Sequence, residues 1–201
     1  MHHGACQRLF VSFFVALGLL LPVCPVAQSE NASDGAPLTL PGADGKDYTP
    51  LSVAGKKAVV FFFVSAYCPT SNTFVPEINR IVADYSEQFT FYLVHADSDL
   101  KLTDVLQHTE MMGIKAAVLL DKEQRLAKRT QAKITPETVV LAPDGHTLYQ
   151  GRINDLYLGP TKKQRQPTTK DLRDALDAIQ AGNPVANAKT EAMGCKISGL
   201  K

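Results

Sequence analysis

The sequence predicts an α/β fold, in which helices flank a central β-sheet. The apolar run at 59–64 has no polar alternation, which is typical of a strand buried on both faces. Strand-like and helix-like segments alternate after it, and a hairpin and a last helix complete the pattern. The 201 residues are enough for one domain of ordinary size with an appendage at each end.

Each element follows from a local pattern. A short strand at 38–40 and an Asp-Gly turn signal open the domain. Apolar residues at spacings of three and four predict amphipathic helices after Cys68 and before Gly182. Thr168 is the expected cap of the last helix. We expect strands at 59–64, 89–95 and 117–120, a hairpin of 138–141 with 147–150, helices at 72–85, 102–106, 123–130 and 169–180, and a polar loop through Pro167.

The amino terminus has the pattern of a secretory signal peptide. Arg8 precedes an apolar run at 9–23, and small residues around Ala27 follow it. The run is too short for a retained membrane span. The alternative is a lipoprotein lipidated at Cys24. We expect an exported protein, periplasmic or extracellular, with a signal peptide at 1–27, a flexible leader at 28–37, a domain at 38–181 and a tail at 182–201 that carries Cys195.

The charge of the chain points to no electrostatic partner. Its 21 Lys and Arg residues almost balance 20 Asp and Glu residues, so the formal net charge is +1. We interpret the basic cluster at 162–165 as a solvated loop. We therefore expect no nucleic-acid partner.

Cys68 is the strongest candidate for chemistry. It follows the apolar strand at the sheet edge where α/β proteins usually place their active sites. A helix capped by Ser71 or Asn72 would start beside it, and the free N–H groups of the first turn would stabilise a thiolate. The thiolate is the reactive form of cysteine. The alternative is a buried structural thiol.

Cys195 would be the only other cysteine of the exported protein, because Cys6 and Cys24 lie in the predicted signal peptide. Two thiols in an oxidising compartment tend to form a disulfide bond. The stretch from Gly182 to Cys195 spans on the order of 40 Å when extended, so reach permits a bond to Cys68 without establishing it. The alternatives are an unpaired thiol or a link to another chain. We expect a tail that is mobile or only locally docked.

Several of these features together resemble the thioredoxin-like superfamily: the apolar strand, the motif Tyr67-Cys68-Pro69-Thr70-Ser71, Pro76 in the next helix, and Thr135-Pro136. Residues 38–181 are most similar to its redoxin branch, the alkyl hydroperoxide reductase and thiol-specific antioxidant (AhpC/TSA) group. The resemblance implies a three-layer fold with a central mixed β-sheet flanked by helices. It also implies a cis Thr135–Pro136 bond that faces Cys68 and offers backbone to an extended substrate.

The resemblance further implies an antioxidant thiol oxidoreductase. Cys68 would act as nucleophile in thiol-disulfide exchange or peroxide reduction, on a peroxide or on a protein or small-molecule disulfide. The expected substrate-binding residues are Tyr67, Pro69, Thr70, Ser71, Thr135 and Pro136. Ser71 occupies the place of the second cysteine of thioredoxins, which makes a CxxS motif. Resolution therefore needs Cys195, another subunit's cysteine or an external thiol reductant.

The motif departs from strict peroxiredoxins, which carry a PxxxTxxC pattern. Ser65 stands at the position of the threonine, and the proline is missing. The activating arginine of that family is unassigned, with Arg125, Arg129 and Arg152 as candidates. These departures weigh against peroxide reduction specifically and leave thiol chemistry in place.

His95 is the remaining candidate. It could act as a general base, or join Cys68, Asp97 and Cys195 in a metal site. We expect a plain surface histidine instead, with no metal and no cofactor. The main alternative to an enzyme is a non-catalytic binding module that presents the same crevice to a partner protein or a metal.

Overall fold

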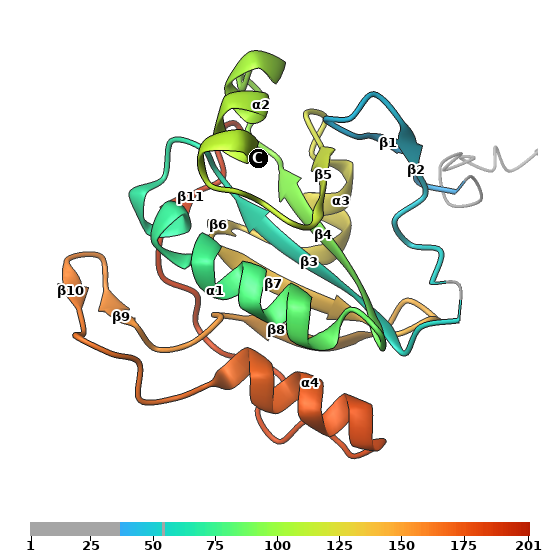
Figure 1. Cartoon of the computed structure of the whole chain (residues 1–201), viewed down its shortest axis with the longest axis vertical. Helices are drawn as coiled ribbons and strands as arrows, with labels where there is room; N and C mark the ends of the chain where they lie inside the picture. Colours follow the sequence, from blue (N-terminus) through green and yellow to red (C-terminus); the bar gives the residue numbers. More distant parts are fainter. Residues whose placement is uncertain (1–36, 54) are drawn as a thin grey trace, which may run out of the picture. The chain divides into compact units, whose positions relative to one another are not determined.

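The computed structural model describes residues 37–53 and 55–201. Its centre is a five-stranded sheet with strand order β5-β4-β3-β7-β8, seen in the middle of Figure 1. β3 pairs in parallel with β4 and antiparallel with β7. The sheet is therefore mixed, as expected. Its strands are β3 (Ala58–Val64), β4 (Phe89–His95), β5 (Ala117–Leu120), β7 (Glu137–Leu141) and β8 (Thr147–Gly151).

Helices cover both faces of the sheet (Figure 1). Every residue of β3 is buried, which confirms the expectation of a two-sided strand. Its alternate residues contribute to two core clusters, one with α1 and α4 and one with α3. The helices are α1 (Pro69–Tyr85), α2 (Leu102–Met111), α3 (Arg125–Thr130) and α4 (Asp171–Ala181).

Short antiparallel strand pairs lie outside the five-stranded sheet. The expected loop before α4 contains one of them, so the prediction of a polar loop is wrong in part. Both residues of one strand of this pair are exposed lysines, so the strand has no apolar pattern that would predict it. The strands are β1 (Leu40–Pro41) with β2 (Asp47–Tyr48), β9 (Tyr157–Gly159) with β10 (Lys162–Lys163), and β6 (Ile134–Thr135) with β11 (Cys195–Lys196).

Thr168 does not cap the last helix. The N-cap position of α4 is Lys170, without a side-chain hydrogen bond. Thr168 donates its backbone N–H and its hydroxyl to Asp155 instead. The buried Asp155 carboxylate also accepts the N–H of Thr169, so it ties the approach to α4 to the segment after β8.

The tail beyond α4 is docked along much of its length, which corrects the expectation of a mobile or only locally docked segment. It first runs beside the sheet edge, where Gln150 donates to Ala188 at 2.9 Å and accepts from Thr190 at 3.0 Å. It then forms β11 against β6. Finally, Ile197 is buried in the core cluster on the α3 side. Each of these contacts involves a single residue, and none of them produces a periodic apolar pattern. The sequence pattern therefore could not predict them.

No helix in the described residues is long and apolar enough to span a membrane. The predicted signal peptide and nearly all of the leader lie outside the described residues.

Candidate active site at Cys68

Cys68 lies at the junction of β3 and α1. It is the N-cap residue of α1, and its carbonyl oxygen accepts the N–H of Asn72 at 3.1 Å. The expected cap at Ser71 or Asn72 is therefore wrong, because the helix starts at Pro69. Proline favours the first helical position, since its missing N–H would have no partner there. The Ser71 hydroxyl oxygen instead accepts the N–H of Ser65 at 3.3 Å, which fixes the loop below the cysteine.

The surroundings of Cys68 favour its thiolate. Burial alone would raise the pKa of this thiol, but hydrogen bonds from the Cys195 thiol, the Ser71 backbone and Thr135 outweigh burial and lower the pKa below its usual value. The Ser71 N–H is one of the free donors at the start of α1. The start of α1 and the Cys195 thiol therefore both lower the pKa of Cys68.

Thr135 faces the sulfur of Cys68. The Thr135–Pro136 peptide bond is cis, as expected. In its protonated form the Cys68 thiol donates to the Thr135 carbonyl oxygen, with 3.1 Å between sulfur and oxygen. Thr135 is itself buried, so the cysteine lies between the start of α1 and the backbone of β6.

Cys195 reaches the same place from the tail. It is the cross-strand partner of Thr135 in the β11–β6 pair, and both cysteines are free thiols in this structure. Partial burial and the neighbouring Cys68 raise the pKa of Cys195 to about 11. The two thiols therefore differ in acidity: Cys68 ionises first, and the protonated Cys195 thiol donates a hydrogen bond to the Cys68 thiolate.

Access to Cys68 runs through a pocket of about 190 Å³. The Cys68 residue is only 1% exposed, yet it contributes to the lining of this pocket. The tail supplies part of the wall through Cys195, Lys196 and Ser198. The rest of the lining is Ser65, Tyr67, Asp97 and Asp99.

Of the residues predicted for substrate binding, only Tyr67 contributes to the lining of this pocket. Tyr67 is 63% exposed, and its hydroxyl donates to Asp104. Pro69 is exposed and Thr70 is partly exposed, whereas Ser71 and Pro136 are buried. Ser71 therefore acts on Cys68 through its backbone N–H, and it is not among the residues that line the pocket.

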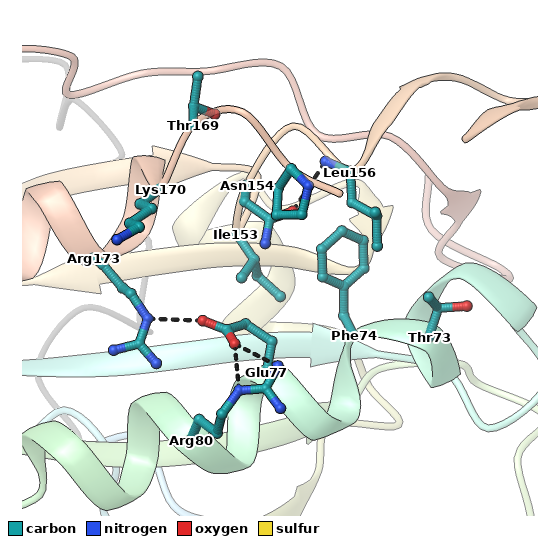
Figure 2. A pocket seen from close by; sticks show the side chains of 11 residues that line it. Thr73, Phe74, Glu77, Arg80, Ile153, Asn154, Leu156, Thr169, Lys170 and Arg173 are labelled. Atoms are coloured by element: carbon teal, nitrogen blue, oxygen red, sulfur yellow. Dashed lines mark hydrogen bonds and ion pairs between the residues drawn. The ribbon is translucent and has the colours of Figure 1, made fainter. Parts of the chain in front are cut away.

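A larger cavity of about 390 Å³ lies elsewhere, between α1 and the start of α4 (Figure 2). Its lining does not include Cys68. Glu77 occupies its floor and pairs with Arg173 at 2.7 Å and with Arg80 at 2.7 Å. Because the lining of this cavity contains no cysteine, we place the chemistry at the smaller pocket.

None of the three candidate arginines lines the Cys68 pocket among the residues that the structure describes. Arg152 forms an ion pair with Asp171 at 3.0 Å, and Arg125 donates to the carbonyl oxygen of Thr39. Arg129 lies exposed on α3. No peroxiredoxin-like arginine can therefore be assigned from these positions.

Sequence reasoning missed the residues that hold the tail end beside the cysteine. The buried Asp97 carboxylate accepts the N–H of Ser198 at 2.9 Å. The Gln124 amide donates to the Ser198 carbonyl oxygen at 2.7 Å and to that of Ala96 at 2.9 Å. Asp97 had a weak signal, because it follows β4 at the same sheet edge, whereas Gln124 had none.

His95 is not a surface histidine, so that prediction is wrong. It is 1% exposed at the end of β4, and its ring packs edge-on against His108 with 5.4 Å between ring centroids. Burial and the charge of His108 lower its pKa to about 3, so it is neutral near pH 7. It does not line the Cys68 pocket, and the described residues contain no group of three or more metal-ligating side chains.

The neutral His95 predicts a pH dependence of stability. Its pKa is lower in the folded chain than in the unfolded chain, so below about pH 6.5 the unfolded chain binds the extra proton and unfolding is favoured. Between about pH 6 and 4, His95 should contribute a loss on the order of 1 kcal/mol per pH unit. Urea unfolding of the wild type and of His95→Phe measures this as a difference in slope. Equal slopes would contradict a neutral buried His95.

Comparison with solved structures identifies the fold. A hypothetical protein of Sinorhizobium meliloti 1021 has a TM-score of 0.70 at 22% identity, over 82% of this chain and 92% of its own. An uncharacterized conserved protein of Geobacillus kaustophilus has a TM-score of 0.69 at 24% identity, over 84% and 91%. A secreted disulfide oxidoreductase of Mycobacterium tuberculosis, homologous to E. coli DsbE, has a TM-score of 0.52 at 16% identity, over 71% and 96%.

The mixed sheet, its flanking helices and these neighbours define a protein with the thioredoxin-like fold, as the sequence predicted. No curated protein matches the chain. The redoxin family profile matches residues 28–176. The chain therefore belongs to the redoxin family, whose members are generally thiol-dependent oxidoreductases.

Proposed function

We propose that this protein is a thiol oxidoreductase in which Cys68 is the nucleophile and Cys195 is the resolving thiol. One observation carries the proposal: the tail places Cys195 opposite Thr135, against a Cys68 whose pKa is lowered. A buried structural thiol needs neither a helix N-terminus nor a second thiol beside it. The Ser71 of the CxxS motif cannot resolve an intermediate, and Cys195 supplies the missing sulfur.

With a disulfide substrate, the Cys68 thiolate attacks one sulfur and the substrate disulfide breaks. The departing thiolate takes a proton from solvent, and a mixed disulfide remains on Cys68. Cys195 then loses its proton and attacks the Cys68 sulfur, which releases the second substrate thiol and leaves a Cys68–Cys195 disulfide. An external thiol reductant returns both cysteines to the thiol form.

With a hydroperoxide, the Cys68 thiolate attacks one oxygen and the O–O bond breaks. The products are a sulfenic acid on Cys68 and an alcohol or water. Cys195 attacks the sulfenic sulfur, a water molecule leaves, and the same intramolecular disulfide forms. The tail thus serves both chemistries, and the reaction with hydrogen peroxide decides whether the protein is antioxidant.

The proposal predicts a reactive thiolate below the usual pKa of cysteine. The rate of Cys68 alkylation by iodoacetamide should rise with pH through the pKa of Cys68 and level off above it. Because the pKa is lowered, the midpoint should lie below the free-thiol value of about 8.5. The measurement follows the Cys68 and Cys195 peptides of the wild-type protein separately by mass spectrometry, because the Cys195 thiol itself lowers the pKa of Cys68. A midpoint at or above 8.5, with no reaction toward peroxide or disulfide, would favour a non-catalytic binding module.

We also propose that the protein is exported, on the basis of the signal-peptide pattern at 1–27. An oxidising compartment would suit a thiol pair that cycles through a disulfide. Expression of the full chain in a bacterium with a periplasm, followed by intact mass measurement of the periplasmic fraction, tests this. We expect a mature chain that starts near residue 28. A full-length chain confined to the cytosol would contradict export.

A further inference from the structure

The tail occupies the backbone edge that faces the reactive sulfur. β11 pairs antiparallel with β6, so the hydrogen-bonding groups beside Cys68 are engaged by the protein's own chain. The Thr135 hydroxyl also donates to the Cys195 carbonyl oxygen at 3.4 Å. An extended polypeptide that bound this edge by strand addition would need the same groups. It therefore has to displace the tail first.

The residues of the tail fit this place closely. A Cβ atom added to Gly194 would lie 2.0 Å from the Thr135 carbonyl oxygen, so only glycine allows the approach. Gly199 has a φ of +75, in the left-handed region, and a Cβ there would lie 2.4 Å from the Ser98 hydroxyl oxygen. Between them, the buried Ile197 anchors the segment in the core. Close contacts therefore fix the tail to the domain on both sides of Cys195.

The space left beside the docked tail suits a small molecule. The pocket of about 190 Å³ has Cys195, Lys196 and Ser198 in its wall. A water molecule takes up roughly 30 Å³, so a hydroperoxide or a short dialkyl disulfide fits. Several residues of extended polypeptide do not fit beside the tail.

We propose that the docked tail makes Cys68 selective for small-molecule oxidants and excludes polypeptide disulfides. This inference rests on the proposed function, because it concerns the substrate of the same nucleophile. The attack is the same on either kind of disulfide: the Cys68 thiolate forms a new S–S bond, the substrate S–S bond breaks, and the departing thiolate is protonated by solvent. Only access differs, so a pair of disulfides that differ in size isolates the effect.

The test compares mixed-disulfide formation on Cys68 in the Cys195→Ser background, where the product is not resolved. The small probe is hydroxyethyl disulfide, and the large probe is a peptide dimer joined by one disulfide. Gly194→Val undocks β11 in the full chain, because the added side chain collides with the Thr135 carbonyl group. Gly159→Val is the matched control, because a Cβ at Gly159 meets only Lys162, at 3.9 Å.

In the docked chain we expect the small disulfide to react and the peptide disulfide to react slowly. Undocking should raise the peptide rate relative to the small-disulfide rate at least about tenfold, equivalent to 1.4 kcal/mol. Trypsin cleavage after Lys196 reports release of the tail, and a thermal melt reports the folded domain. An unchanged ratio in a folded variant with a released tail would overturn the inference alone. Failure of Cys68 to react with either disulfide or with hydrogen peroxide in every variant would overturn the proposed function as well.

Discussion

Cys195→Ser should abolish efficient turnover while preserving the first reaction of Cys68. The tethered thiol acts at an effective concentration of the order of mM, because docking holds it beside Cys68. With an external thiol at about 10 μM, loss of Cys195 should therefore slow resolution about 100-fold. Steady-state consumption of hydrogen peroxide or hydroxyethyl disulfide with limiting thiol measures turnover. Mass spectrometry should then find an adduct or a sulfenic acid on Cys68.

Cys68→Ser is the comparison for this experiment, since it should lose the first step too. The two variants together separate nucleophile from resolving thiol. Wild-type turnover in Cys195→Ser would remove the tail from the mechanism and assign resolution to the external reductant.

Ile197→Ala should release the tail and slow closure of the disulfide. Ile197 is 4% exposed within a core cluster, and truncation of a buried isoleucine typically costs about 2 to 5 kcal/mol. Part of this loss falls on docking, so we expect closure to slow at least about tenfold. The rate at which the reduced protein forms its intramolecular disulfide after one equivalent of oxidant is the measurement.

Leu158→Ala provides the matched control, because Leu158 is 44% exposed on β9 and its truncation should leave closure unchanged. If Ile197→Ala closes its disulfide as fast as the wild type although trypsin shows a released tail, docking is not what brings the thiols together.

Much of the fold was predictable because its signals are local or periodic. The strands at 89–95 and 117–120 match β4 and β5, since each apolar run is bounded by polar residues or turns. The hairpin of β7 and β8 followed from the Asp144–Gly145 turn signal. The predicted start of α1 was too late in the chain, because cysteine is not one of the usual N-cap residues and Cys68 was not considered as the cap.

The candidate site was predictable only in part. Cys68 could be identified because it follows a strand end, and Thr135 could be identified through the resemblance of its Thr-Pro pair to that of thioredoxin-like proteins. Docking of Cys195 depends on Gly194, Ile197 and the Gln124 amide, which make single contacts with residues distant in the chain. The burial of His95 likewise depends on its packing against His108, on another element.

The most direct test of a Cys68–Cys195 redox pair is peptide mapping of the non-reduced protein after one equivalent of hydrogen peroxide or hydroxyethyl disulfide. The account predicts one intramolecular disulfide between these two residues, which forms in the monomer and disappears on reduction. A protein in which both thiols remain free, or in which Cys195 bonds only to another chain, would contradict it.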